Sequence, residues 1–222
     1  MNIKSFSRLT GFVYLLLVPL GVFGIMYVPS LLVEGNLPLT IENIKSNEFV
    51  VRLAIAASLF IQLIHFILVL MLYRIFKVVN IRIAKIMVLL VMVGVPIAML
   101  NELNFGAVLF IFANAEISNL LIPLFFELHE FGIMIVGVFW GLWLFPLGYL
   151  VYKSNFIPKI IGIALMIGCF GYVIDSFMFI IAPDFGFQFA EFLFVGELMI
   201  TFWLLIMGVN EKMYDIVKQN AI

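Results

Sequence analysis

The sequence predicts an all-α, polytopic membrane protein, a bundle of six transmembrane helices arranged as three antiparallel hairpins. Of its 222 residues, 65% are hydrophobic and only 11% are charged, whereas soluble domains are roughly 45–50% apolar and about 25% charged. The apolar residues fall in stretches of about 20 or more, the length that crosses a hydrocarbon core roughly 30 Å thick as a helix. The alternating pattern of membrane β-strands is absent from the sequence.

Six apolar stretches are predicted to span the membrane, within a single domain that covers residues 1–222. In chain order they are residues 10–33, 50–73, 86–112, 121–152, 160–182 and 190–209. The first follows Lys4 and Arg8 as a signal peptide would, but it is long and lacks a small-residue cleavage site, so we expect it to remain a span. Residues 34–49 form the one long outer loop, where we expect a short interfacial helix with Thr40 as its N-cap. The remaining connections are short and favour antiparallel hairpins.

Lysine and arginine residues are divided unevenly between the two predicted sides of the membrane. Ten lie at the N-terminus, in the turns after spans two and four, and in the C-terminal tail, whereas Lys45 and Arg52 fall on the other side. The positive-inside rule therefore predicts that both termini are cytoplasmic. Aromatic residues typical of a membrane interface lie near the same ends of the spans: Tyr73, Trp143, Tyr149 and Tyr152.

Prolines and small residues predict how the helices bend and pack. We expect Pro19, Pro96 and Pro146 to kink spans one, three and four. Small residues let helices approach closely where the hydrophobic effect is absent, and they recur in spans four and five at Gly137, Gly141, Gly148, Ala164, Gly168 and Gly171. We interpret them as contacts within one chain, and a homodimer interface is the alternative.

Polar residues inside the spans are the candidates for function, because each charge costs about 2.5–3.5 kcal/mol at a helix centre. Counted from the cytoplasmic ends, they lie in the outer part of the membrane: Asn101, Glu102, Glu127, His129, Glu130, Asp175 and Glu197. Lipid-facing carboxylates are costly, so we expect the acidic residues to converge inside the bundle, with Arg52 as the nearby fixed cation. Such a layer would bind a cation, share protons or hold water. The alternative is solvation at the interface, above all for residues 127–130.

Signatures of other functions are weak or absent. Ser58, Gln62 and His65 share one face of span two, and we interpret them as interhelical hydrogen-bonding residues rather than haem ligands. Glu127 and His129 lack the Glu-x-x-His spacing of helical metal sites, and no HExxH, GxSxG or Walker A motif occurs. The 12 Lys and Arg residues do not outnumber the 13 Asp and Glu residues, so no nucleic-acid partner is expected. We predict no cofactor and no metal site.

Several short motifs spread over nearly the whole chain resemble one family. They are Arg8-x-x-Gly11, Asn43-Ile44, Glu48-Phe49-x-x-Arg52, Gly148-Tyr149-Leu150, Ser154-x-Phe156-Ile157-Pro158, Gly162, Gly171-Tyr172-x-x-Asp175-Ser176-Phe177, Pro183, Gly196-Glu197, Trp203-Leu204-Leu205 and Gly208-Val209. In these the chain resembles the bacterial multi-pass membrane proteins grouped as domain of unknown function 4386. The resemblance implies a single domain in the cell membrane of a prokaryote, and it implies that Arg52, Asp175 and Glu197 belong to the family pattern. It supplies no catalytic residues.

Three functional hypotheses follow from the sequence. The leading one is a protein that binds or transports a small ligand, a cation or protons through an outward-facing polar site. The second is a membrane-embedded enzyme that uses Glu, His and Asp for acid–base or metal chemistry, which the missing motifs make less favoured. The third is a structural or sensory subunit whose outer loop, residues 34–49, contacts a partner. The expected partners are the lipid bilayer, a small ligand or cation, and a second copy of the chain.

Overall fold

The computed structural model describes residues 1–33, 35–111 and 115–220, and its regular elements there are all helical. The elements are α1 (Ile3–Met26), a 3₁₀ turn η1 (Pro29–Leu31), α2 (Leu37–Ser46), α3 (Glu48–Phe76), α4 (Ile81–Asn101), α5 (Leu103–Ile111), α6 (Ala115–Leu142), α7 (Leu144–Ser154), α8 (Lys159–Ile181), a 3₁₀ turn η2 (Pro183–Phe185), α9 (Ala190–Leu193), α10 (Val195–Phe202), a π-helical segment η3 (Trp203–Met207) and α11 (Glu211–Asn220). The predicted fold class is confirmed.

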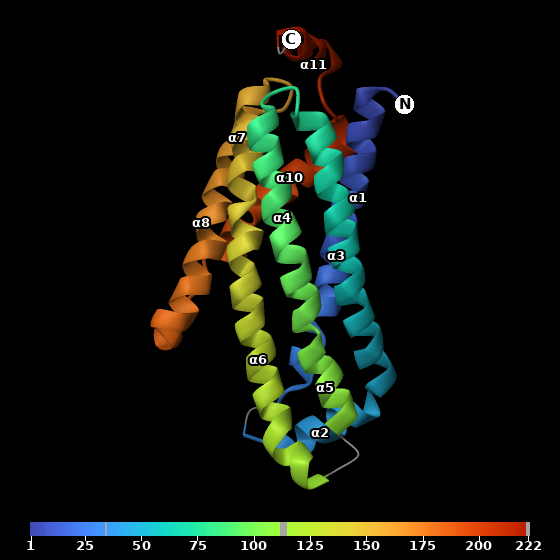
Figure 1. Ribbon diagram of the computed structural model, residues 1–222, viewed down its shortest axis with the longest axis vertical. Coiled ribbons are helices and arrows are strands. Elements are labelled where there is room, and N and C mark those ends of the chain that lie inside the picture. Colours follow the sequence, from blue (N-terminus) through green and yellow to red (C-terminus); the bar gives the residue numbers. More distant parts are fainter. Residues whose placement is uncertain (34, 112–114, 221–222) are drawn as a thin grey trace.

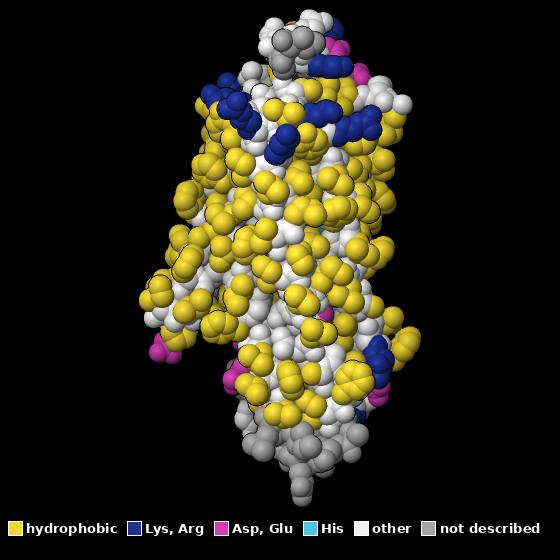
Figure 2. All heavy atoms as spheres, viewed as in Figure 1, with side chains coloured by type: hydrophobic (Ala, Val, Ile, Leu, Met, Phe, Trp, Pro, Cys, Tyr) yellow, Lys and Arg dark blue, Asp and Glu magenta, His cyan; other side chains and the backbone are white. Residues whose placement is uncertain are grey.

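Six helical segments of the described chain are long and apolar enough to cross a membrane, as predicted. They are Ile3–Leu31, Glu48–Phe76, Ile81–Ile111, Leu121–Ser154, Lys159–Ile181 and Ala190–Met207. The first helix begins seven residues before the predicted span because the Asn2 side chain accepts a hydrogen bond from the Ser5 amide, which caps it. Figure 2 shows apolar side chains over most of the visible face and Lys and Arg side chains gathered at one end. Which end faces the cytoplasm stays a prediction.

The outer loop contains a helix, α2, but the predicted cap was wrong. Asn36 caps α2 by accepting a hydrogen bond from the Leu39 amide at 3.1 Å. Thr40 lies inside the helix and is buried, and its hydroxyl oxygen accepts a bond from the Val33 amide at 2.9 Å. Asn36 precedes Leu37-Pro38, and a proline in the first helical turn is favoured because its missing N–H is not needed there.

Two of the long spans are broken, one of them near a position where a bend was expected. Span four divides into α6 and α7 at Trp143, one turn before Pro146, whose ring nitrogen cannot donate to the Leu142 carbonyl. Span three divides into α4 and α5 at Glu102, whereas Pro96 lies inside α4, so the break falls at a polar residue rather than at the proline. Pro19 lies inside α1, which the structure records as one helix.

Consecutive helices lie side by side, and the last span returns to the first. α1 packs against α3, α3 against α4, α4 against α6, and α7 against α8, while α10 and η3 fit between α8 and α1. Figure 1 shows the N-terminus and α11 at the same end of the bundle. Helices approach closely at several glycines: a Cβ on Gly148 would lie 2.5 Å from the Gly162 carbonyl oxygen. The homodimer reading of these small residues stays a prediction.

Two apolar clusters divide the interior of the bundle. The first, which includes Leu68 and Leu144, fills the end where Lys and Arg gather. The second, which includes Val51, Phe105 and Ile122, lies toward α2 and α5. Along α3, α4 and α6, buried polar residues such as Gln62, Asn101 and His129 lie between the residues that belong to these two clusters.

Candidate functional site

The carboxylates expected to converge lie instead in separate places. Glu102 pairs with His129, Glu197 is hydrogen-bonded by two tyrosines, and Asp175 binds backbone amides. Among the described residues, no three His, Cys, Asp or Glu side chains come together as a metal site. The expectation of a single acidic layer was therefore wrong for Glu102, which is paired through Oε1 alone while its Oε2 is buried without a partner among the described residues.

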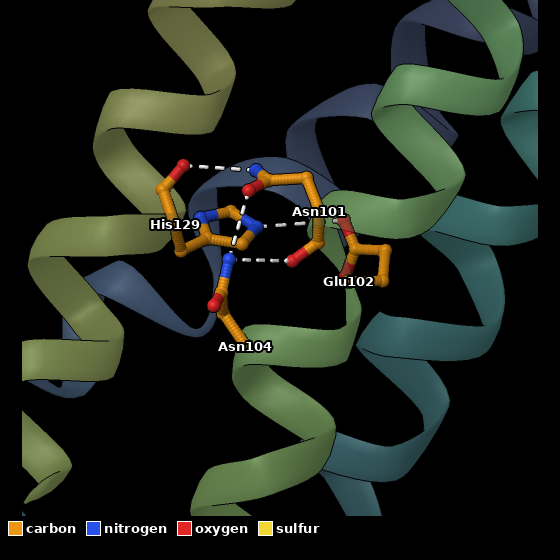
Figure 3. A network of polar contacts seen from close by, with 4 residues as sticks. All are labelled: Asn101, Glu102, Asn104 and His129. Atoms are coloured by element: carbon orange, nitrogen blue, oxygen red, sulfur yellow. Dashed lines mark hydrogen bonds and ion pairs between the residues drawn. The ribbon is translucent and has the colours of Figure 1, made fainter.

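The first place is a buried network between α4, α5 and α6. Asn101 donates from Nδ2 to the His129 carbonyl oxygen at 2.8 Å, and Asn104 donates to the Asn101 carbonyl and side-chain oxygens at 3.1 and 2.9 Å. His129 Nε2 lies 3.5 Å from Glu102 Oε1, and its ring stacks on Phe105. Figure 3 shows Asn101 and Glu102 directed toward His129. This network joins α6 to the break between α4 and α5.

The second place is Glu197, whose carboxylate joins the first, fifth and sixth spans. Tyr14 of α1 donates to Oε2 at 3.1 Å, and Tyr172 of α8 donates to Oε1 at 2.8 Å. Glu197 lies in the first turn of α10, which sits between these two helices. The two phenol groups therefore hold the carboxylate from both sides.

Glu197 lines a partly open cavity of about 240 Å³, which we call the inner cavity. Residues from α1, α3, α6, the junction of α6 and α7, α8 and α10 surround it: Leu17, Ile25, Ile61, Gln62, His65, Trp140, Trp143, Tyr172 and Glu197. Gln62 and His65 are more than nine-tenths buried, yet Gln62 Oε1 and His65 Nε2 have no hydrogen-bond partner among the described residues. Our expectation of satisfied interhelical hydrogen bonds was therefore wrong for these two atoms.

An outer cavity of about 320 Å³ lies between α6, α8 and the segment that follows α8. Asp175 and Glu130 line it together with Ser176, Gln188 and several aromatic rings. The two Asp175 carboxylate oxygens accept bonds from the Phe189 and Ala190 amides at 2.8 and 2.7 Å, which fixes the start of α9 beside the cavity.

Trp140 and Tyr172 line both cavities, so these two side chains separate the inner cavity from the outer one. Tyr172 is held in place by its hydrogen bond to Glu197. The two cavities share this wall, and we call the pair the two-chamber site.

Two predicted site residues lie on the surface. Arg52 forms an exposed ion pair with Glu48 at 2.7 Å, one helical turn away, and is not among the described residues that line the two-chamber site. Glu127 is exposed, whereas Glu130, also exposed, reaches the outer cavity. Exposed pairs of this kind contribute about 0.2–1 kcal/mol to stability, so the Arg52 pair is a weak contact.

Three residues at the site were not predicted from the sequence. Tyr14 and Trp140 were not singled out, and Trp143 was assigned to an interfacial belt although it is 2% exposed and its ring lies 5.0 Å from that of His65. Tyr14 could have been identified from the sequence, because it lies inside the first span, where the hydroxyl group of a tyrosine needs a buried hydrogen-bond partner. Trp140 and Trp143 could not, since tryptophan is also an ordinary residue of membrane interfaces.

Comparison with known proteins places most of this chain in one family. The profile described as "Domain of unknown function (DUF4386)" matches residues 9–208. A protein of Archaeoglobus fulgidus described as "Uncharacterized protein" is 34% identical over 88 residues, which is 37% of this chain and 53% of that protein. The matched region thus spans about half the length of that curated relative. No solved structure matches the chain.

Proposed function

This chain belongs to the family described as domain of unknown function (DUF4386), and from that premise we propose that it binds a small molecule within the membrane and exchanges it with the outer side. The two-chamber site is the binding site in this proposal. The outer cavity admits the molecule, and the inner cavity holds it beside Glu197.

One observation carries the proposal. Gln62 Oε1 and His65 Nε2 are buried without partners among the described residues, on the wall of the partly open cavity that Glu197 also lines. A buried polar group left unpaired costs about 1–3 kcal/mol, so two such groups on one cavity favour an occupant that hydrogen-bonds to them. Small-molecule sites in proteins have this character, mostly apolar walls with a few convergent polar groups.

The arrangement of the spans supports access from the outer side. The apolar cluster around Leu68, Leu144 and Leu147 closes the bundle toward the end where Lys and Arg gather. The outer cavity is open at the far end of α8 instead. The proposal therefore describes a binding protein, or a transporter in its outward-open state, in the cytoplasmic membrane of a prokaryote.

Cysteine accessibility tests the proposal. The chain has a single cysteine, so C169S gives a cysteine-free background into which I61C on the inner cavity and V69C in the apolar cluster are introduced separately. Both positions are buried on α3, which makes them a matched pair. A thiol reacts as the thiolate and therefore needs water.

We expect a small neutral methanethiosulfonate reagent to modify I61C at least tenfold faster than V69C in protein reconstituted in nanodiscs. Equal rates at the two positions, or no reaction at either, would show that the inner cavity is not accessible and would overturn the proposal.

A further inference from the structure

The side chains that line the two-chamber site share one electrostatic character. Glu130, Asp175 and Glu197 supply carboxylates, and no lysine or arginine occurs among the described residues that line either cavity. The sequence carries nearly equal numbers of basic and acidic residues, so this lining is a local bias rather than a property of the whole chain. A negatively charged molecule would find no cation to pair with there.

The inner cavity offers hydrogen-bond acceptors that are not fully used. A carboxylate has about four lone-pair positions, and the hydrogen bonds from Tyr14 and Tyr172 occupy two positions on Glu197. Gln62 Oε1 is a further acceptor, buried and without a partner. The nearby phenol protons are already donated to Glu197. An occupant that satisfies Glu197 and Gln62 must therefore bring N–H or O–H donors of its own, while the unpaired His65 Nε2 accepts or donates according to its tautomer.

Aromatic rings make up much of the remaining wall. Trp140, Trp143 and Tyr172 border the inner cavity, and Phe179, Phe185 and Phe187 border the outer one. The faces of aromatic rings attract cations, by about 0.5–1 kcal/mol when exposed and about 2 kcal/mol or more when desolvated. Carboxylates combined with aromatic faces are the chemistry with which proteins recognise ammonium groups.

A bare metal ion fits this lining less well than an organic cation. Ca²⁺ and Mg²⁺ require about six or more oxygen ligands in a compact shell, and no group of three acidic or histidine side chains suited to a metal occurs in the described part of the chain. Leu17, Ile25 and Ile61 also line the inner cavity, which is about 240 Å³ in volume. These walls favour an occupant with an apolar portion.

Resting on the proposed function above, we infer that the ligand of the two-chamber site is a small organic ammonium ion with an apolar substituent. The ammonium group donates hydrogen bonds to Glu197 and Gln62 in the inner cavity, and the ring faces of Trp140 and Trp143 lie beside the charge. Glu130 and Asp175 attract the cation to the outer cavity, and Trp140 and Tyr172 separate its two positions.

Three probes of similar size test the charge preference: 2-phenylethylamine, which is a cation at pH 7, the neutral 2-phenylethanol, and the anion phenylacetate. Binding is measured by the change in tryptophan fluorescence of the protein in zwitterionic nanodiscs, with empty nanodiscs as the blank. Two of the three tryptophans of the chain line the site, and W203F removes the signal of the third. We expect the amine to bind at least tenfold more tightly than the alcohol or the anion.

Two variants test whether Glu197 is responsible for amine binding. E197Q should weaken amine binding at least tenfold, whereas E127Q, which changes an exposed glutamate that lines neither cavity, should leave it unchanged. A cooperative thermal unfolding transition verifies that E197Q is folded. If E197Q does not fold, the comparison of the three probes on the wild-type protein still tests the inference. Equal binding of amine and alcohol, or an equal loss in E127Q, would overturn the inference while leaving the proposed function in place. No binding of any probe would overturn the inference, and unreactive I61C would overturn the proposed function as well.

Discussion

The contact between α1 and the π-helical segment depends on the absence of a side chain at Gly11. A Cβ at this position would lie 2.7 Å from Leu205 Cα and 2.8 Å from the Leu204 carbonyl carbon. Both are backbone atoms, so no side-chain rotation relieves the overlap, and ordinary contact begins only at 3.4 Å. The backbone nitrogen of Leu205 would lie closer still, so the variant G11A must push α1 and η3 apart by more than about 0.7 Å.

The cost of this displacement can be bounded. Inserting a methyl group into a closely packed interior lowers the free energy of unfolding by about 1–3 kcal/mol. Replacing glycine by alanine inside a helix raises it by about 1 kcal/mol, because alanine has the higher helix propensity. A Cβ on Gly21 of the same helix would meet no atom within 4 Å, so G21A has the propensity gain without the overlap. We expect G11A to be less stable than G21A by about 1–3 kcal/mol.

The single cysteine of the chain allows thermal unfolding to be measured. Cys169 is 4% exposed, so a thiol-reactive fluorophore reports its release as the detergent-solubilised protein is heated. At about 2–4 °C per kcal/mol for a chain of this size, the apparent Tm of G11A should fall several degrees below that of G21A. Tyr14 lies one turn further along α1, so its hydrogen bond to Glu197 should be disturbed as well.

Equal melting temperatures for G11A and G21A would refute this reasoning. That result would mean that α1 and η3 separate without loss of stability, and that the sixth span is not held against the first by close backbone contact.

Three further changes have defined outcomes. Asn101→Ala removes the hydrogen bond to the His129 carbonyl and should destabilise the protein by about 1–3 kcal/mol, measured by the same cysteine assay. Asp175→Asn keeps only one acceptor oxygen for the two amides at the start of α9, so those amides should exchange hydrogen faster while the Tm changes little. Burial raises the pKa of Tyr214 above its usual value of 10.0. The protonated phenol therefore favours the docked α11, a contribution that is complete below pH 10 and is lost as the pH rises through the raised pKa. Tryptic cleavage at Lys212 should accelerate in that alkaline range for the wild type, and Tyr214→Phe should abolish the increase.

The number and order of the spans followed from the sequence, because the thickness of the hydrocarbon core sets how long an apolar helix must be. The predicted second span, residues 50–73, lies inside α3, Glu48–Phe76, and the family resemblance seen in short motifs is confirmed over residues 9–208. The length of a span is a property of one helix at a time, because each helical residue advances by about 1.5 Å.

The partners of the polar side chains were decided only by the tertiary structure. A soluble helix shows its buried face by its apolar stripe, but a membrane helix is apolar all round, so its rotation about its own axis leaves little trace in the sequence. Glu197 was therefore predicted to face other carboxylates, whereas it faces Tyr14, 183 residues away, and Tyr172. Chain composition and bilayer thickness determined that the helices span the membrane. Close packing at glycines such as Gly11 and Gly148 determined which faces meet, and with them the cavities between the helices.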